Sequence, residues 1–247
     1  MMLLLDIGNT NLRWTLADDQ GLGEVGVVRH DGGIPLDLLA SWERLAPRPE
    51  RVLVSNVGGA AVAEALSRVS RAYWALEPEF VATRATWGRL RIAYDEPSRL
   101  GVDRWLGLVA AEAEGEGAKL VLDAGTAVTF DLLAADGEHL GGVILPGIEM
   151  MRASLLAGTA IPRITAEPSG ESWARDTGAA VAAGSLQAVL GVATRLYDQF
   201  VSQTGEMPRL LLTGGDAPRL AGQLDRPWEA VPDLVLRGLA RVGARQA

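Results

Sequence analysis

Residues 3–21, LLLDIGNTNLRWTLADDQG, repeat the pattern of residues 120–137, LVLDAGTAVTFDLLAADG. Each stretch has three apolar residues, an Asp, a small or apolar residue, a Gly and soon a Thr, and each ends at an acidic turn with Gly. A short apolar run predicts a central strand, and the alternation after it predicts a second strand that folds back on the first. The repeat therefore predicts two related halves, with Asp6 and Asp123 at matching positions.

The elements predicted around these stretches follow one order in both halves: three strands, a helix, a strand and a helix. In the first half we expect strands at 3–6, 11–17, 24–29 and 51–56, extended pieces at 80–82 and 90–94, and helices at 36–45 and 60–70. Pro97 and Ser98 introduce a third helix, which runs through Asp103 to about Ala113. In the second half we expect strands at 119–123, 127–133, 141–145 and 209–213, helices at 146–157, 177–202 and after Asp216, and a loop at 162–176. The class is α/β, with mixed β-sheets flanked by helices. The segment EGEGAK (114–119) is a polar connector. We expect the boundary between the two lobes within residues 105–119 and divide the chain into lobes 1–110 and 111–247.

The composition is that of an acidic globular chain. Its 247 residues are 48% hydrophobic and 22% charged, and 23 Lys and Arg against 31 Asp and Glu give a net charge of −8. A surface of this sign disfavours sequence-independent nucleic-acid binding, which needs basic groups to neutralise phosphates. The absence of Cys excludes disulfides, thiolate nucleophiles and iron–sulfur ligation.

Neither histidine, His30 or His139, lies in a metal-binding spacing, and we expect both at the surface or at hairpin tips. The N-terminus MMLLLDIGNT lacks a basic region and reaches an Asp too early for a signal peptide. The longest apolar stretch, 178–196, is interrupted by polar residues and predicts a buried helix, not a membrane span. We therefore expect a cytoplasmic protein that binds neither membrane nor nucleic acid.

The turn at 6–10, DIGNT, has the residue types that suit a polyphosphate. Gly8 permits a positive φ and a close approach to a ligand, and successive turn N–H groups form an anion-binding concavity to which the Asn and Thr side chains add donors. An Asp beside such a turn can meet Mg²⁺, which takes oxygen ligands and keeps several waters. One such turn alone is explained as well by a tight hairpin. The second copy at 123–126 and the run LTGGD at 212–216 favour a phosphate clamp.

Five segments, in their order and spacing, resemble type III pantothenate kinases: DIGNTN (6–11), LGVDRW (100–105), DAGTAVTFD (123–131), GGVILPGIEMMRASLLAGTA (141–160) and LTGGDA (212–217). The resemblance implies two ribonuclease-H-like lobes of the actin/hexokinase-like superfamily. It implies ATP-dependent phosphorylation of pantothenate to 4′-phosphopantothenate, the first step of coenzyme A biosynthesis. It also implies a homodimer with the substrate site near the subunit interface.

The resemblance implies a role for each matching residue. Asp103 would be the catalytic base that faces the primary hydroxyl of pantothenate. Asp123 would hold a monovalent cation, K⁺ or NH₄⁺, and Asp6 would contact ATP and its Mg²⁺, directly or through water. The other ATP contacts would be Ile7, Gly8, Asn9, Thr10, Asn11, Leu12, Arg13 and Thr126. The other pantothenate contacts would be Tyr94, Gly101, Val102, Arg104 and Thr177.

The chemistry of Asp103 limits what it does as a base. Its intrinsic pKa is about 3.9, and a position near a helix N-terminus keeps it ionised, so it is a poor base for an alcohol. Phosphoryl transfer has a loose transition state, so Asp103 would orient the hydroxyl and accept its proton late. Most of the catalysis would come from positioning and from cations on the phosphates. Without the resemblance, Asp103 is explained better as a stabilising acid in a first helical turn, with Arg104 as its surface neighbour.

Three of the substrate residues also have structural alternatives. Arg104 suits an ion pair with Asp95 or Glu96. Tyr94 suits an aromatic at a strand end, and Thr177 suits the N-cap of the long helix that it opens.

The resemblance is incomplete at 173–176, where WARD replaces a Gly often found before the Asx-Thr pair, and at 11–14, NLRW, which is bulkier than in some members. Two other functions stay open. One is another small-molecule kinase of the superfamily, and the other is a non-catalytic regulatory or accessory protein on the same fold.

Overall fold

The computed structural model describes residues 1–161 and 173–245. The chain divides into two compact units, Met1–Glu114 together with Asp233–Ala247, and Gly115–Pro232. Most of the loop predicted at 162–176 lies outside the described residues.

The first unit is built on a six-stranded sheet in the order β3-β2-β1-β5-β6, with β4 also beside β2. Its centre is β1 (Met2–Ile7), which pairs antiparallel with β2 (Asn11–Asp18) and parallel with β5 (Arg51–Asn56). The other strands are short: β3 (Gly21–Leu22), β4 (Gly26–Arg29) and β6 (Glu79–Phe80). A separate hairpin joins β7 (Thr86–Trp87) to β8 (Leu90–Arg91).

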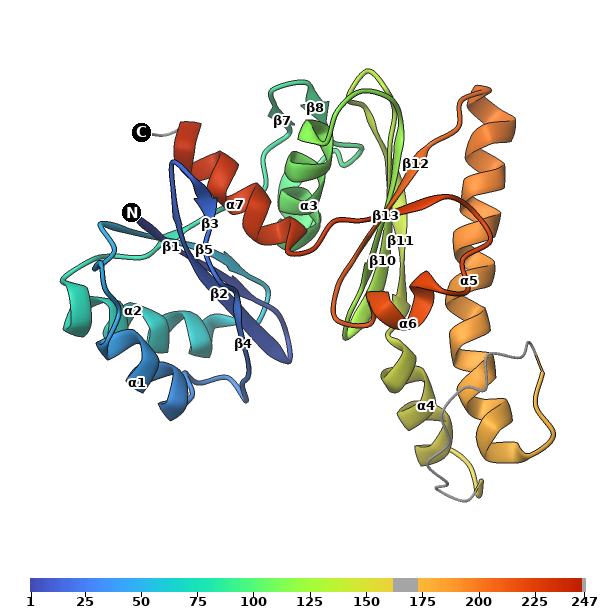
Figure 1. The fold of residues 1–247 in the computed structure, drawn as a ribbon, viewed down its shortest axis with the longest axis horizontal. Helices are drawn as coiled ribbons and strands as arrows, with labels where there is room; N and C mark the ends of the chain where they lie inside the picture. The colour runs from blue at the N-terminus through green and yellow to red at the C-terminus, as the bar shows by residue number, and fades with distance from the viewer. Residues whose placement is uncertain (162–172, 246–247) are drawn as a thin grey trace. The chain divides into compact units, whose positions relative to one another are not determined.

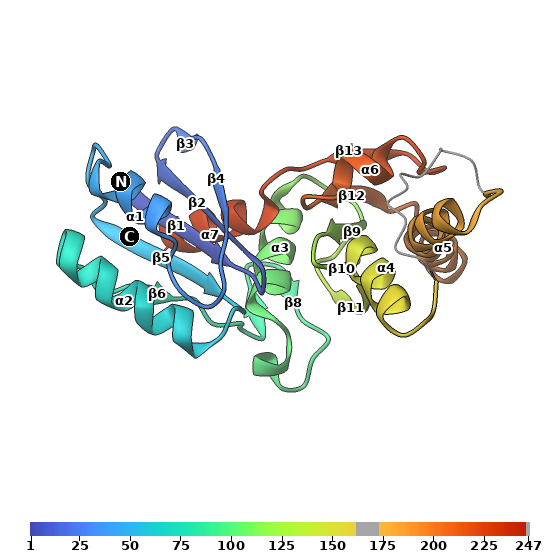
Figure 2. The same cartoon turned by 90° about the horizontal axis from the view of Figure 1, so that it is seen from below.

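Helices cover both faces of this sheet (Figures 1 and 2). On one face, α1 (Leu36–Glu43) and α2 (Ala60–Trp74) pack Trp42 and Leu66 against Leu3, Leu5 and Ile7. On the other face lie α3 (Val102–Ala113), which follows the 3₁₀ turn Pro97–Arg99, and α7 (Leu234–Arg245). Because residues alternate along a strand, β1 contributes apolar side chains to both layers.

The helix α7 differs from the predicted division of the chain. The predicted lobe 111–247 includes this helix, but α7 packs on α3, β1 and β5 of the first unit. Gly238 permits this packing, because a Cβ there would lie 2.2 Å from the carbonyl oxygen of Leu106. The buried Leu234, Leu236 and Leu239 complete the layer. A division of the chain into two consecutive lobes cannot show that the C-terminal segment packs on the N-terminal unit.

The second unit repeats the arrangement with a five-stranded sheet, β11-β10-β9-β12-β13. Here β9 (Lys119–Ala124) pairs antiparallel with β10 (Ala127–Leu133) and parallel with β12 (Arg209–Thr213). The edges are β11 (His139–Pro146) and β13 (Trp228–Ala230). The predicted α/β class with two related mixed sheets is therefore confirmed.

The helices of the second unit are α4 (Ile148–Ala157), α5 (Thr177–Thr204) and α6 (Ala217–Ala221). Figure 1 shows α5 along the sheet, where Leu186, Val189 and Ala193 are buried against Leu122, Phe130 and other strand residues. By length and composition alone α5 could cross a membrane. Its apolar stripe is already buried in this core.

The sequence predicts that His139 lies at the surface or at a hairpin tip, and for this residue the prediction of a surface position is wrong. It is buried at the start of β11, and its imidazole Nε2 lies 3.0 Å from the Oδ1 atom of the buried Asp131. The register between β10 and β11 shifts at Leu132 and Leu133, and Leu133 then pairs with His139. Such an irregularity redirects a side chain in a way that strand alternation does not predict.

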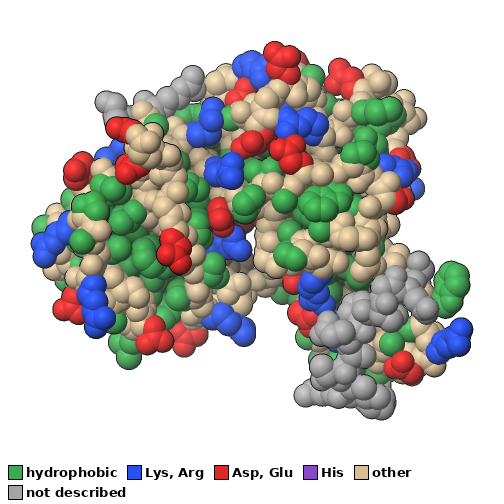
Figure 3. Space-filling view, viewed as in Figure 1, with side chains coloured by type: hydrophobic (Ala, Val, Ile, Leu, Met, Phe, Trp, Pro, Cys, Tyr) green, Lys and Arg blue, Asp and Glu red, His purple; other side chains and the backbone are tan. Residues whose placement is uncertain are grey.

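Charged side chains of both signs are interspersed on the face shown in Figure 3, and the described Lys and Arg side chains there do not gather into one basic area. This distribution agrees with the acidic composition of the chain.

Candidate active site

The first phosphate turn joins β1 to β2 at the edge of the first unit's sheet. The Gly8 N–H donates to the carbonyl oxygen of Asn11 at 2.9 Å and closes the turn. Asn9 and Asn11 are exposed, whereas Gly8 and Thr10 are half-buried. Within the described chain, the N–H groups of Asn9 and Thr10 have no hydrogen-bond acceptor. The turn thus presents backbone donors that an anion can accept.

Ile7 and Leu12 border the turn but are fully buried in the core, so only their backbone can meet a ligand. Arg13 lies beside Asp6 in the ladder of β1 and β2. Its guanidinium Nη1 donates to Asp233 Oδ1 at 2.7 Å, immediately before α7. The predicted ATP contact Arg13 is therefore engaged in an ion pair that ties α7 to the sheet.

Asp6 is half-buried at the end of β1. Ser55 of β5 lies on its other side in the ladder, with a fully buried hydroxyl. Partners in register place their side chains on one face of a sheet, so Asp6 lies between Arg13 and Ser55.

Asp103 lies in the first turn of α3 and is half-buried. Its Oδ1 atom accepts the backbone N–H of Arg104 at 2.8 Å, which holds the carboxylate at the helix N-terminus. Gly101 is the N-cap residue, and a Cβ there would lie 2.5 Å from Asp103 Oδ1. Gly101 therefore leaves the space that this carboxylate occupies, and Val102 between them is half-buried.

Arg104 brings a second predicted substrate residue to the same place. Its guanidinium Nη1 donates to the Tyr94 hydroxyl at 3.2 Å, and both side chains are half-buried. Tyr94 follows β8, so two separate segments of the first unit meet at the start of α3. A carboxylate, a guanidinium and a phenol there can orient a polar substrate.

Thr177 belongs to the second unit, where it is the first residue of α5 and is exposed. The N-cap of α5 is Asp176, whose Oδ1 atom accepts the N–H of Ala179 at 3.0 Å. The alternative role of Thr177 as the N-cap is therefore wrong.

The second phosphate turn joins β9 to β10. Gly125 N–H donates to the carbonyl oxygen of Ala127 at 2.9 Å, in the manner of the first turn. The carbonyl oxygen of Thr126 accepts the N–H of Gly147 at 2.9 Å, and that of Ala124 accepts the N–H of Asp216 at 2.9 Å. The turn is thus fixed by Gly147, the N-cap of α4, and by the loop after β12, and Thr126 stays exposed.

Asp123 has different neighbours from Asp6. It is half-buried between Thr129 of β10 and Thr213 of β12 in the ladders. The next residue, Gly214, has a φ of +94°, and a Cβ there would lie 2.5 Å from Asp123 Oδ1. Two threonines flank this carboxylate, whereas an arginine and a serine flank Asp6. The two turns are therefore chemically unequal.

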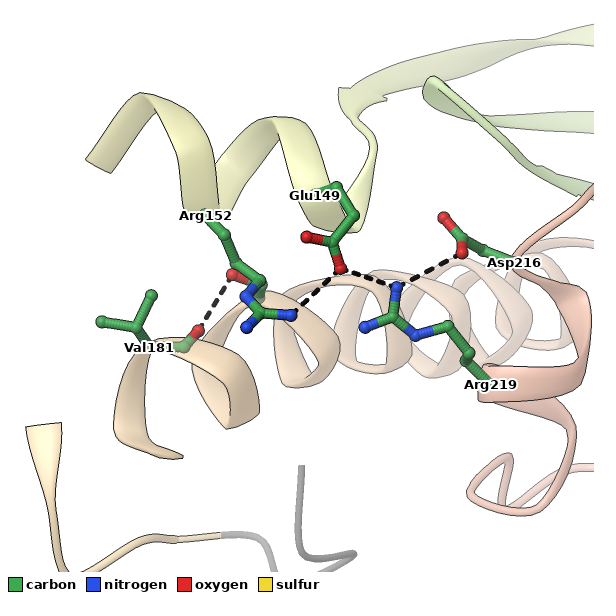
Figure 4. A network of polar contacts seen from close by, with 6 residues as sticks. Glu149, Arg152, Val181, Asp216 and Arg219 are labelled. Atoms are coloured by element: carbon green, nitrogen blue, oxygen red, sulfur yellow. Dashed lines mark hydrogen bonds and ion pairs between the residues drawn. The ribbon is translucent and has the colours of Figure 1, made fainter. Parts of the chain in front are cut away.

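An ion-pair network supports the loop after β12 (Figure 4). Arg219 Nη1 of α6 lies 2.8 Å from Glu149 Oε1 of α4 and 3.3 Å from Asp216 Oδ1. Arg152 also pairs with Glu149, at 3.0 Å. Burial raises the pKa of Glu149, but hydrogen bonds and charge from Arg219 and Arg152 outweigh burial and hold this pKa below its usual value. The network ties the first turns of α4 and α6 together.

Within residues 1–161 and 173–245, no group of three or more His, Asp or Glu side chains converges as a metal site. A single carboxylate such as that of Asp6 can supply one oxygen ligand to a Mg²⁺ ion whose other ligands are phosphate oxygens and waters. The threonine hydroxyls beside Asp123 are neutral oxygens, which suit a weakly held monovalent cation.

Several residues that lie beside these turns have no local sequence pattern that marks them. They are His30 and Gly58, which both lie next to the Gly8 carbonyl oxygen, Ser55 beside Asp6, and the Glu149–Arg219 pair. Each acts through contacts between segments far apart in the sequence, and no local spacing marks such contacts. Position is the one local indication, because Ser55 lies in the predicted strand 51–56 and Gly58 follows that strand.

Comparison with solved structures defines the class of fold. The chain is similar to a putative 2-dehydro-3-deoxygalactonokinase from Sinorhizobium meliloti, with a TM-score of 0.60 at 16% identity over 100% of this chain and 96% of that one. It is also similar to a conserved putative Baf family transcriptional activator from Campylobacter jejuni, with a TM-score of 0.59 at 23% identity over 99% and 98%. The fold is actin/hexokinase-like, as the motifs implied.

Comparison of sequences then gives the family. Residues 2–199 match the model of the type III pantothenate kinases. The chain is 42% identical to a type III pantothenate kinase from Nitrosococcus oceani, over 98% of this chain and 93% of the relative. It is 36% identical to one from Aromatoleum aromaticum, over 100% and 99%. The chain therefore belongs to the type III pantothenate kinase family.

Proposed function

We propose that this chain transfers the γ-phosphoryl group of ATP to the primary hydroxyl of pantothenate and so makes 4′-phosphopantothenate. Family membership makes it a pantothenate kinase of coenzyme A biosynthesis. The observation that carries the mechanism is the meeting of Tyr94, Asp103 and Arg104 at the start of α3. A regulatory role without catalysis would not require this set of polar groups.

Asp103 orients the substrate hydroxyl and accepts its proton in this proposal. Its bond to the Arg104 N–H fixes the carboxylate at one rotamer, and the absence of a Cβ at Gly101 gives it room. The transition state of phosphoryl transfer is loose, so little proton removal is needed early and Asp103 takes the proton late.

Arg104 and Tyr94 bind pantothenate. The guanidinium can pair with the carboxylate of pantothenate or donate to its amide and hydroxyl oxygens, and the Tyr94 hydroxyl limits how the guanidinium rotates. We also assign a substrate contact to Thr177, which its exposed position at the start of α5 supports.

ATP contacts are assigned to residues of each turn, each taken by itself. The N–H groups of Asn9 and Thr10 donate to the phosphates, and Thr126 adds a hydroxyl. Mg²⁺, when bound with ATP, supplies the charge that neutralises the phosphate oxygens, and Asp6 would hold it, directly or through water.

Asp123 holds a monovalent cation in this proposal, between the hydroxyls of Thr129 and Thr213. Turnover should then rise when K⁺ or NH₄⁺ replaces Na⁺, and Asp123→Asn should remove most of that difference. Equal rates in Na⁺ and K⁺ buffers would contradict the assignment.

We also propose a cytoplasmic homodimer. Large apolar side chains are exposed on the edge strand β11 and on α4: Leu140 45%, Ile144 60%, Met150 47% and Leu155 44%. An apolar face on an edge strand is a common site of self-association. Light scattering should give twice the mass of the chain, and Ile144→Asp should shift the species towards monomer. A monomeric wild type at micromolar concentration would contradict the dimer.

The function is tested by a coupled ADP-release assay with pantothenate as acceptor and by the mass of the product. Release of ADP should depend on pantothenate and yield 4′-phosphopantothenate. A panel of sugars serves as the comparison, because other kinases share this fold. ADP release with a sugar but not with pantothenate would overturn the proposal in favour of another kinase, and no release with any acceptor would favour a regulatory protein.

A further inference from the structure

His30 follows β4 and contacts the first phosphate turn twice. Its backbone N–H donates to the carbonyl oxygen of Thr10 at 3.0 Å, and its imidazole Nε2 lies 2.8 Å from the carbonyl oxygen of Gly8. Both contacts join the residue after β4 to the turn between β1 and β2. The sequence predicts a position at the surface or at a hairpin tip for His30, and its side chain is half-buried.

The hydrogen bonds of the ring fix where its proton lies. The Gly32 N–H donates to His30 Nδ1 at 3.2 Å, so Nδ1 is an acceptor. The neutral ring therefore carries its proton on Nε2, and this N–H donates to the Gly8 carbonyl oxygen. The histidine thus acts as a donor of fixed direction.

The backbone of Gly58 packs against the other side of the Gly8 carbonyl group. A Cβ on Gly58 would lie 2.7 Å from this carbonyl oxygen and 3.3 Å from Cε1 of His30. Gly58 is itself held by Asn56, whose Oδ1 atom accepts the Gly58 N–H at 3.0 Å. The carbonyl group therefore lies between the imidazole and the backbone of Gly58 and has little freedom to rotate.

The direction of this carbonyl sets the direction of a phosphate donor. The Gly8 carbonyl and the Asn9 N–H belong to one planar peptide unit, and the bond between Gly8 and Asn9 is trans, so the two groups point in opposite directions. The Asn9 N–H, which has no acceptor within the described residues, then points away from His30. If the peptide rotated, a carbonyl oxygen would face the anion in its place.

We infer that His30 is a positioning residue for the nucleotide: its Nε2–H holds the Gly8 carbonyl so that the Asn9 N–H stays directed at the bound phosphates. The inference rests on the proposed binding of ATP at this turn, and it adds a residue that does not itself touch the ligand. The energy of one neutral hydrogen bond sets the size of the effect, about tenfold in nucleotide affinity.

The test is calorimetric binding of a non-hydrolysable ATP analogue with Mg²⁺ to the full chain. His30→Leu should weaken binding about tenfold, and His30→Gln, which restores an amide donor, should lie within about threefold of wild type. Val27→Ala is the control: Val27 is an exposed residue (52%) of β4, the strand that precedes His30, and this variant should bind as wild type does. In kinetics the KM for ATP should rise in His30→Leu, while the KM for pantothenate at saturating ATP stays constant. A folded His30→Leu that binds as wild type, or a folded His30→Gln as weak as His30→Leu, would overturn the inference.

A measurement on the wild type keeps the inference testable if a variant does not fold. Nitrogen-15 NMR should find the His30 proton on Nε2, and the Asn9 amide resonance should shift when the analogue binds. A proton on Nδ1, or an Asn9 amide that does not respond to bound analogue, would overturn it. Because pantothenate is absent from the binding assay, a wild type that binds the analogue but does not phosphorylate pantothenate counts against the proposed acceptor and not against His30.

Discussion

Replacing Gly214 with Ala tests how closely the loop after β12 packs on the second phosphate turn. A Cβ at this position would lie 2.3 Å from the carbonyl oxygen of Ala124 and 2.5 Å from Asp123 Oδ1. The first atom belongs to the backbone of a central strand and cannot move aside cheaply. The φ of +94° adds a conformational cost of about 1–2 kcal/mol for any residue with a Cβ. With the steric displacement, we expect a loss of about 2–4 kcal/mol in the free energy of unfolding.

Gly215→Ala is the matched control, because a Cβ there meets nothing within 4 Å and its φ lies outside the positive range. Thermal unfolding without nucleotide should lower the melting temperature of Gly214→Ala by about 5–12 °C and leave Gly215→Ala within about 2 °C of wild type. Potassium activation should weaken in Gly214→Ala, because the Asp123 carboxylate has to shift. If both alanine variants unfold together with the wild type, the close approach described at this turn is wrong.

Three further changes test other parts of the structure. Gly101→Ala should displace the Asp103 carboxylate, because a Cβ would lie 2.5 Å from its Oδ1 atom. We expect kcat to fall about tenfold or more, with little change in melting temperature. An unchanged kcat would contradict the role given to Gly101. A double-mutant cycle on Arg13 and Asp233 should give a coupling of about 1 kcal/mol in chemical denaturation, because both side chains are partly buried, and a coupling near zero would show that the pair does not hold α7. The pKa of Glu149 is lower in the folded chain than in the unfolded chain, so its contribution to stability is present above the unfolded pKa and is lost as pH falls through the folded value. Denaturant titrations from pH 7 to pH 3 should therefore find a smaller loss of stability in Glu149→Gln than in wild type, and parallel losses would contradict the network.

The centre of both sheets could be predicted from the sequence because the information there is local. An apolar run, an Asp–Gly turn and an alternating run specify β1 with β2 and β9 with β10, and the strands lie at those places. The same locality explains why the turn residues and the start of α3 were found. These features depend on neighbours only a few residues away.

The features that the sequence did not predict depend on contacts between distant residues. The ion pair of Arg13 joins residues 220 positions apart, so a residue expected at ATP holds a helix of the same unit. His139 turns inward through a shift in strand register, and Asp176 caps α5 although Thr177 also suits a cap. In each case the competing interaction is set by tertiary packing, which local pattern does not contain.

The turnover of Asp103→Asn with ATP and pantothenate tests the central claim most directly. The substitution keeps the shape of the side chain and an oxygen that can accept the Arg104 N–H, but it removes the negative charge that takes the proton. We predict a fall in kcat of about a hundredfold or more, with analogue affinity within about threefold of wild type. Asp95→Asn, an exposed carboxylate before the same helix, should retain wild-type turnover. A folded Asp103→Asn with the kcat of the wild type would contradict the assignment of the base.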